Sequence, residues 1–365
     1  MIHRLKKQLK RLNVQKLLYP VLSLFSHKKH RETAEHARQV MEEYSPQPLS
    51  DAFAENKVVR TPAYDLQIII PAYNAQQYIT ECLNSIVNQR TAYSYKIVVI
   101  DDGSTDRTAE LLEAFDNENI TIIHQENKGF SGARNTGLKE IDSSYIMFVD
   151  SDDKLAEDAV QVLLQTAIEN NADIVQGGNY EWDGDLLTVH NSFPDSTQLP
   201  KNKLTGYPWG KVMKSRLFEN LCFPEHYLFE DTIFSFLVNE QADVICSVSQ
   251  IVYYYRVNWN SISHTVAENP RSIETVWITE MLLEMRKSLL YRSDTKEFYE
   301  IFMKQVILNY KRTKQLPECV QKSIFVVHAQ MLRETFSQSF GMYKPLFHSL
   351  YNDDYGRYRL YCMLA

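Results

Sequence analysis

Three aspartates stand within four consecutive positions near the middle of the chain. Asp150, Asp152 and Asp153 come directly after the apolar run YIMFV (145–149). Carboxylates this close repel one another unless a positive group shares their charge, and Mg²⁺ and Mn²⁺ prefer such oxygen ligands, often together with substrate phosphates. The sequence DSDD therefore predicts a site for a divalent cation and a diphosphate. The structural alternative, a cap on the following helix, needs only one of the three carboxylates.

A second acidic pair, Asp101 and Asp102, follows the apolar run KIVVI (96–100). The next residues, GSTD, would form a turn and cap a helix whatever the function. In a binding site, one of these carboxylates could accept a hydrogen bond from a nucleobase imide while Tyr73, which ends an earlier apolar run, stacks on the base. The pair is ambiguous when it is considered alone.

The segment ENKGFSGARNTGL (126–138) places Arg134 near the start of an expected helix, among several glycines. Glycine allows close backbone approach, and an arginine at a helix N-terminus suits a phosphate or holds nearby carboxylates. A buried structural ion pair with an aspartate is the alternative, and the two roles are compatible.

Glu230 and Asp231 form another acidic pair, set between apolar residues in HYLFEDTIFSF (226–236). A carboxylate in partly apolar surroundings has a raised pKa, which makes it a better general base for a sugar hydroxyl. An acid at a helix N-terminus is the structural alternative. Further on, YYYRVNWNSISHT (253–265) could close over a diphosphate or lie on the surface as a polar loop, and its tyrosines are expected in the core.

These polar clusters need a scaffold, and the apolar patterns between them predict one. Continuous apolar runs of strand length alternate with helix-period segments at the spacing of βαβ units, which predicts an α/β fold with a doubly wound, mostly parallel sheet. Ligands bind at the carboxyl ends of such strands, so the clusters should meet in one crevice. The expected strands are 66–74, 95–104, 120–126 and 145–150, and the expected helices are 75–89, 106–115, 132–141 and 156–170.

The charge of the chain is unevenly distributed. Residues 1–31 contain nine Lys or Arg and no Asp or Glu, so the formal net charge of −7 leaves −16 on the rest. The acidic remainder argues against nucleic acid as a partner. The apolar run LLYPVLSLF (17–25) is too short to span a bilayer, but with its basic flanks it predicts attachment to an anionic membrane surface. A helix packed on its own domain, or a solvated arm, is the alternative.

The expected organisation has three parts. Residues 1–64 form a basic helical segment and linker, residues 65–264 form the catalytic domain, and residues 265–365 form a helical C-terminal region. The five cysteines show no metal-ligand spacing and fit a reducing cytosol.

Four segments, in this order and spacing, resemble the nucleotide-sugar-binding half of the inverting family 2 glycosyltransferases with a GT-A fold. They are IIIPAYNAQQYITECLNSIVNQ (68–89), IVVIDDGSTDRT (97–108), NKGFSGARNTGL (127–138) and YIMFVDSDD (145–153). The resemblance extends more loosely through PWGKVMKSRLF (208–218) and FEDTIF (229–234) to about residue 264. That second part is similar to bacterial enzymes of capsule, exopolysaccharide and teichoic-acid synthesis.

The resemblance implies a role for each matching residue. Asp231 would be the general base, with Glu230 beside it, and either Asp101 or Asp102 would read uracil. Asp152, Asp150 and His264 would hold a divalent metal, Mn²⁺ or Mg²⁺, with Asp152 the direct ligand. The implied nucleotide-sugar contacts are Pro71, Ala72, Tyr73, Asn74, Asp101, Asp102, Asn127, Arg134, Asp150, Ser151, Arg256 and Ser263. Trp209 and Lys211 fall where related enzymes contact the sugar or the acceptor.

The implied activity is inverting transfer of a sugar from a nucleotide carrier, with UDP expected, to a hydroxyl of a surface glycan or lipid-linked glycan. Such an enzyme would be cytoplasmic and attached to the inner face of the cell membrane through residues 1–31. The alternative is a non-catalytic nucleotide-sugar-binding or scaffold subunit of a membrane glycan-assembly complex. A degraded D-x-D or a missing base would favour that alternative, and both are intact here.

Overall fold

The computed structural model describes residues 14–258 and 269–365. They form two compact units, one within Leu49–Trp259 and the other within Met1–Pro48 together with Asn260–Ala365. The first unit, termed the catalytic unit below, is therefore inserted between two parts of the second, termed the helical unit.

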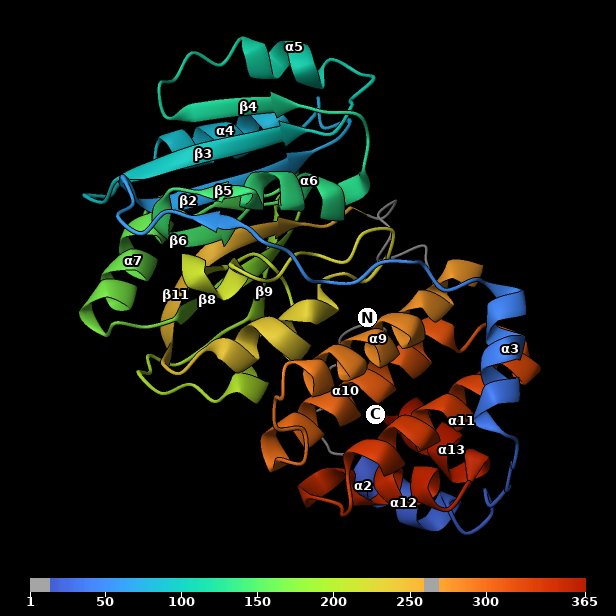
Figure 1. Ribbon diagram of the computed structural model, residues 1–365. Coiled ribbons are helices and arrows are strands. Elements are labelled where there is room, and N and C mark those ends of the chain that lie inside the picture. The colour runs from blue at the N-terminus through green and yellow to red at the C-terminus, as the bar shows by residue number, and fades with distance from the viewer. Residues whose placement is uncertain (1–13, 259–268) are drawn as a thin grey trace. The chain divides into compact units, whose positions relative to one another are not determined.

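The catalytic unit is built on a mixed sheet in the order β4-β3-β2-β6-β10-β8-β11-β7, with β9 paired to β8 (Figure 1). Neighbouring strands among β4, β3, β2 and β6 are parallel, whereas β10 runs antiparallel to both β6 and β8. The strands are β2 (Tyr64–Ala72), β3 (Tyr95–Asp101), β4 (Ile120–His124), β6 (Ser143–Phe148), β7 (Lys154–Leu155), β8 (Ile174–Asp183), β9 (Leu186–Asn191), β10 (Lys211–Lys214) and β11 (Ile245–Arg256).

The parallel strands are the predicted apolar runs, and helices cover both of their faces. Ile68 of β2 belongs to the core cluster shared with α4 (Ile79–Val87), α5 (Thr108–Glu113) and α7 (Ala159–Glu169). Ile69 points the other way, toward α6 (Gly129–Leu138), because successive strand side chains alternate between faces. A Cβ on Gly137 would lie 2.5 Å from the Ile69 side chain, so this glycine permits the close approach of α6. The predicted doubly wound, mostly parallel sheet is confirmed.

The second half of the catalytic unit extends the sheet. The WDGD turn (182–185) joins β8 and β9 in a hairpin, and Gly184 takes the positive φ of 59° that the turn needs. A separate parallel pair links β1 (Lys57–Val58) to β5 (Glu140–Ile141). Short helical turns complete the unit: η1 (Lys201–Lys203), η2 (Ser215–Phe218), the π-helix η3 (Phe234–Val238) and η4 (Asn239–Gln241).

The helical unit confirms the predicted helical C-terminal region and adds two N-terminal helices to it. Its helices are α2 (Val14–Leu22), α3 (Ala34–Tyr44), α9 (Glu274–Ser288), α10 (Lys296–Thr313), α11 (Glu318–Thr335), α12 (Lys344–Tyr351) and α13 (Tyr355–Leu364), with the 3-10 turns η6 (Pro270–Ile273) and η7 (Gly341–Tyr343). Along the described stretches, no helix is both long enough and apolar enough to cross a membrane.

Specific contacts hold the N-terminal helices to the C-terminal ones. Arg38 of α3 donates from Nε to Glu280 of α9 at 2.9 Å, and the Trp277 indole donates to the carbonyl of Ser45 at 3.1 Å. Tyr19 of α2 packs edge-on against Tyr361 of α13, with ring centroids 5.3 Å apart. The apolar run at 17–25 therefore packs partly on its own unit, which was the alternative considered for it.

Candidate active site

The carboxyl ends of β2, β3 and β6 bring three of the predicted polar clusters together. The amide of Asp102, after β3, donates to the carbonyl of Ala72 in β2 at 2.8 Å. Asn74 accepts a hydrogen bond from the Thr105 amide at 2.8 Å, which ties the loops after these two strands to each other. After β6, Val149 donates to the Ile69 carbonyl of β2 at 3.1 Å. The three clusters therefore meet at one edge of the sheet, as the strand order predicts.

The aspartates after β6 have different surroundings. Asp153 is buried and has a structural role: its carboxylate accepts hydrogen bonds from the Tyr253 hydroxyl at 2.8 Å and from the Arg256 amide at 2.7 Å. Asp150 accepts from Arg134 at 2.8 Å. The carboxylate of Asp152 is hydrogen-bonded by its own backbone amide and by no side chain among the described residues. Asp153 thus anchors the end of β11 and does not cap α7, whose N-cap is Asp158.

The donor set of Asp150 and Asp152 fits a hard divalent cation. Burial, and after it the negative charge of Asp150, raises the pKa of Asp152 to about 6. A cation beside the two carboxylates would remove this mutual repulsion, and oxygen donors are the ligands that Mg²⁺ and Mn²⁺ prefer. Within residues 14–258 and 269–365, no group of three or more His, Cys, Asp or Glu side chains surrounds a common metal position. Two protein carboxylates with substrate phosphates need no such group.

Arg134 connects the D-x-D segment to the E-D segment. Its guanidinium donates to Asp150 at 2.8 Å and to Glu230 at 2.5 Å, and it is 5% exposed. The Phe223 ring lies under it, with 5.3 Å from Cζ to the ring centroid. The ion pair between Arg134 and an aspartate, one of the two roles open to this arginine from the sequence, is present in the structure. The second partner, Glu230, was not predicted for Arg134.

The E-D pair itself is divided between a buried and a half-buried carboxylate. Burial raises the pKa of Glu230 above its usual value, while its contact with Arg134 opposes the shift. Asp231 is half-buried and precedes η3, whose first amide, that of Phe234, donates to the Asp231 carbonyl at 3.0 Å. Lys211 of β10 is fully buried, and burial lowers its pKa to about 7 against the raising effect of the Asp231 charge. Asp231 is thus the more accessible carboxylate of the pair.

The two aspartates after β3 also differ. Both carboxylate oxygens of Asp101 are engaged, by the Ser104 amide at 3.1 Å and by His124 Nδ1 at 2.8 Å. Burial raises the pKa of Asp101, but these hydrogen bonds outweigh it and leave the pKa below its usual value. Asp102 uses only Oδ1, which accepts from Gln125 at 2.6 Å and from the Lys128 amide at 2.9 Å. Its Oδ2 has no hydrogen-bond partner among the described residues.

The other predicted nucleotide contacts lie around the same strand ends. Tyr73 is 51% exposed, and Asn74 follows it with a positive φ of 50°. Pro71 and Ala72 are the last residues of β2. Asn127 is exposed and caps Gly129 through its side chain at 3.1 Å, and Ser151 lies half-buried between the aspartates.

Arg256 lies at the end of β11 beside the D-x-D segment. Its Nε donates to the Asp152 carbonyl at 2.7 Å, a terminal nitrogen donates to Glu81 at 2.6 Å, and its guanidinium lies 3.8 Å from the centroid of the Trp182 ring. Arg256 therefore lies next to the D-x-D segment, and its role as a nucleotide contact stays a prediction. The predicted residues Ser263 and His264 lie outside the described residues.

Several residues at this edge of the sheet have contacts that the sequence does not predict. Tyr253 was assigned to the core with its neighbours; it is buried, but its hydroxyl also accepts from the Asp150 amide at 3.1 Å. Gln125, Glu81 and Trp182 were not considered. Gln125 falls within the expected strand 120–126, but β4 ends at His124, so Gln125 stands directly after that strand. Glu81 lies in α4 and Trp182 in β8, where no pattern in the sequence distinguishes them.

Comparisons with known proteins agree with this geometry. Residues 67–219 match Glycosyl transferase family 2. The chain is 30% identical to Glycosyltransferase GlyA of Streptococcus pneumoniae over 67% of its own length and 41% of that protein. It is also 30% identical to a poly(ribitol-phosphate) beta-glucosyltransferase of Bacillus spizizenii, over 69% of its own length and 41% of that protein. The matched region thus spans less than half of both relatives.

Among solved structures, the chain resembles a crystal structure of S. aureus TarS 1-349 in complex with UDP-GlcNAc. The TM-score is 0.64 at 21% identity, and the match covers 82% of this chain and 90% of that one. At this identity the likeness concerns the fold. Through residues 67–219 and the sheet that carries them, the chain belongs to glycosyltransferase family 2, with the GT-A fold.

Proposed function

We propose that this protein transfers a sugar, with inversion, from UDP to a hydroxyl of a bacterial surface glycan. The observation that carries the proposal is the Arg134 bridge. Because one buried guanidinium holds both Asp150 and Glu230, the carboxylates suited to a cation and the base candidate Asp231 belong to one site. Separate structural ion pairs would not require this convergence.

The loops after β2 and β3 would hold the nucleotide. Tyr73 is exposed and can stack on a base. Asp102 is the better candidate to read uracil, because its Oδ2 remains available to accept the imide N–H, whereas both oxygens of Asp101 are engaged. The crystal structure of TarS with UDP-GlcNAc supports a UDP-linked donor as the class, without naming the sugar.

In the reaction, the Asp231 carboxylate would take the proton of the acceptor hydroxyl. The acceptor oxygen would attack the anomeric carbon in line, while the bond from that carbon to the diphosphate oxygen breaks, so the configuration inverts. A bound divalent cation, held by Asp150 and Asp152, would supply neutralisation of the charge on the departing UDP. Arg134 would keep Asp150 and the E-D segment in fixed relative positions.

One similarity and one surface feature support the proposed acceptor and the proposed location. The match to a poly(ribitol-phosphate) beta-glucosyltransferase supports an acceptor of the surface-glycan type. Residues 18–25, on and after α2, expose apolar side chains, which together with the basic residues of 1–31 supports attachment to the inner face of the cell membrane.

The proposal is tested by calorimetric titration with UDP, with and without Mn²⁺, followed by a panel of UDP-sugars assayed for slow hydrolysis and transfer. We expect metal-dependent binding and preferential turnover of one sugar. Asp231→Asn should leave UDP binding intact and lower turnover by about 10²–10⁴-fold. Asp152→Asn should weaken the metal-dependent part of UDP binding.

Asp185→Asn is the matched control. This substitution removes the same charge, but Asp185 lies in the exposed β8–β9 turn. Full turnover in Asp231→Asn would overturn the assignment of the base. Absence of UDP binding under both metal conditions would favour another nucleotide carrier or a scaffold role.

A further inference from the structure

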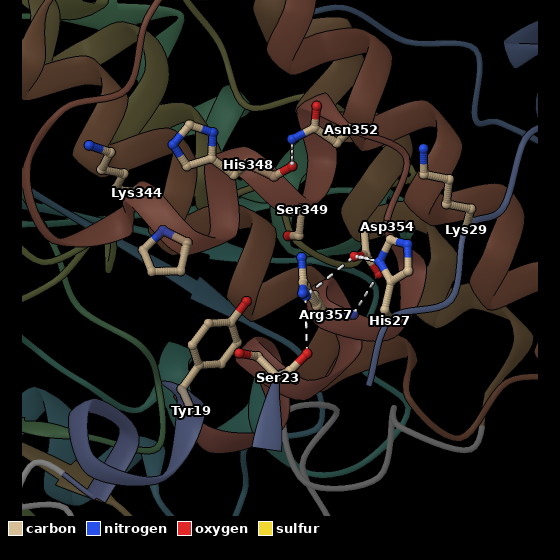
Figure 2. Close-up of a pocket in the computed structure, with 11 residues that line it drawn as sticks. Tyr19, Ser23, His27, Lys29, Lys344, His348, Ser349, Asn352, Asp354 and Arg357 are labelled. Atoms are coloured by element: carbon tan, nitrogen blue, oxygen red, sulfur yellow. Dashed lines mark hydrogen bonds and ion pairs between the residues drawn. The ribbon is translucent and has the colours of Figure 1, made fainter. Parts of the chain in front are cut away.

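The helical unit contains a cavity of about 700 Å³ that the proposed reaction does not use (Figure 2). Its walls come from α2 and the segment after it, from α12, and from the start of α13. Tyr19 and Ser23 contribute one side and His348 and Ser349 another. Ligand pockets in proteins typically enclose about 300–1,000 Å³, so the cavity has room for a small polar group.

Two lysines at the cavity lack partners among the described residues, and an arginine is only partly engaged. The ammonium groups of Lys29 and Lys344 form no hydrogen bond or ion pair with any described residue, and Figure 2 shows them on opposite sides of the cavity. Arg357 Nε donates to the Ser23 carbonyl at 3.1 Å and lies 3.5 Å from Asp354 Oδ2, whereas its terminal nitrogens have no described partner. The ring of His348 is exposed at the same cavity. The two ammonium groups and the terminal nitrogens of Arg357 are therefore available as donors to an anion.

Asp354 is the one acidic side chain among the residues lining the cavity, and its charge is already shared. It is buried and accepts hydrogen bonds from His27 Nδ1 at 2.5 Å and from the Lys28 amide at 3.1 Å. It also accepts from the Arg357 amide at 3.2 Å. Burial raises the pKa of Asp354, but these contacts lower it below its usual value. Asp354 therefore builds the wall of the cavity, and the neighbouring Arg357 guanidinium offsets part of its negative charge.

Apolar side chains stand exposed on the same segment. α2 directs Tyr19 toward α13, while the side chains around it remain in solvent, including Leu24 at 70% and Phe25 at 86% exposure. The other exposed apolar residues of this segment are Leu18, Val21 and Leu22. A stretch of exposed Leu, Val and Phe next to a cationic cavity is the combination that a membrane interface favours, apolar bulk together with a positive charge.

We propose that the cavity binds the phosphate of an anionic phospholipid headgroup while the apolar side chains of residues 18–25 enter the boundary of the acyl chains. The inference deepens the proposed membrane attachment and rests on it, but it is independent of sugar transfer. It assigns the attachment to a defined headgroup site, formed jointly by the N-terminal segment and the C-terminal helices. A soluble phosphate compound would use the same donors but would leave the apolar side chains unexplained.

The test uses the full chain and flotation with vesicles of phosphatidylcholine alone or mixed with an equal amount of phosphatidylglycerol. We expect the protein to float with the mixed vesicles and only weakly with the neutral ones. The double variant Lys29→Gln/Lys344→Gln should lower the affinity for mixed vesicles about 20-fold. Its matched control, Lys296→Gln/Lys314→Gln, removes the same charge from exposed lysines outside the cavity and should cost less than about threefold.

A second matched pair tests the apolar edge. Phe25→Ser should weaken binding to mixed vesicles about tenfold. Leu290→Ser, at a residue that is 89% exposed and does not line the cavity, should leave binding unchanged.

Five outcomes would overturn the inference. Equal losses in the two lysine pairs would show a diffuse charge effect, and equal flotation with both vesicle types would remove the headgroup requirement. Calorimetric binding of glycerol phosphate, lost in Lys29→Gln/Lys344→Gln while flotation persists, would assign the cavity to a soluble phosphate. Absence of flotation in the unsubstituted protein would reject membrane attachment itself, whereas flotation that the double variant retains would reject only the cavity.

Discussion

Glu230 lies 96 residues from Arg134 in the sequence, yet the two side chains meet in a buried ion pair. The same guanidinium holds Asp150 at 2.8 Å. A buried charge that loses its partner is costly, so these carboxylates depend on the arginine more than a surface pair would. The bridge therefore contributes both to the geometry of the proposed site and to the stability of the catalytic unit.

Arg134→Gln should lower the free energy of unfolding by about 3–5 kcal/mol, because it leaves the buried Glu230 and the half-buried Asp150 without their cation. Turnover should fall with it, since Asp150 and the E-D segment lose their common anchor. Denaturant unfolding and sugar transfer measure the two effects. Arg107→Gln is the control, since it breaks an exposed ion pair with Glu110 in the same unit and should leave stability unchanged. Equal stability of both variants would contradict the role of the bridge.

Tyr253→Phe should weaken UDP binding and lower the free energy of unfolding by about 1–3 kcal/mol. The hydroxyl donates to Asp153 and accepts from the Asp150 amide, so its removal takes one hydrogen bond from each of these groups. Tyr254→Phe removes a hydroxyl that forms no hydrogen bond with a described residue and should change stability by less than about 0.5 kcal/mol. Calorimetry with UDP and denaturant unfolding compare the pair. Identical results for the two variants would remove Tyr253 from the site.

Asp102→Asn should reduce UDP affinity about 10–100-fold, because an amide donor could then face the imide N–H of uracil. Asp101→Asn should mainly reduce stability, since Asp101 binds Ser104 and His124 of its own unit. The ratio of the change in UDP affinity to the change in unfolding free energy separates the two aspartates. A larger affinity loss in Asp101→Asn would reverse the assignment.

The helical unit should lose stability in mild acid through His328. This ring is fully buried, with the Asn309 amide 3.0 Å from Nε2, and burial lowers its pKa from 6.5 to about 3. As the pH falls below 6.5, His328 takes up a proton in the unfolded chain but stays neutral in the folded chain. The free energy of unfolding therefore decreases. From pH 7 to pH 5 the loss from this group is about 2 kcal/mol.

Denaturant unfolding at the two pH values measures this effect. His328→Gln should remove that part of the pH dependence, whereas His36→Gln, at an exposed histidine of the same unit, should retain it. A wild-type unfolding free energy that is equal at both pH values would contradict the prediction.

The parallel strands could be predicted from the sequence because a strand buried on both faces must be apolar throughout. Ile68, Ile69 and Ile70 show this directly, since all are fully buried although their side chains alternate between the faces. Strand order then placed Asp102 and Asp150 at one edge, because parallel strands end on the same side.

Which aspartate does what could not be read from DSDD. Asp153 is set apart from Asp152 by Tyr253, a hundred residues further along the chain, and no local pattern encodes a contact of that range. The same holds for α3: its buried Ala37 and Met41 predict an apolar face but do not specify which helix covers it.

The joining of distant segments in the helical unit also sets an order of events during synthesis. His27 and Asp354 are 327 residues apart, and a Cβ on Gly356 would lie 1.8 Å from the Ser26 carbonyl oxygen, so these segments fit together without slack. At about 5–20 residues per second, the ribosome needs on the order of tens of seconds to produce the second partner. The inserted catalytic unit can fold in that interval. Until the C-terminal helices have been synthesised, the apolar N-terminal segment has no partner helices. We expect it to bind a chaperone or to contact the bilayer during this time.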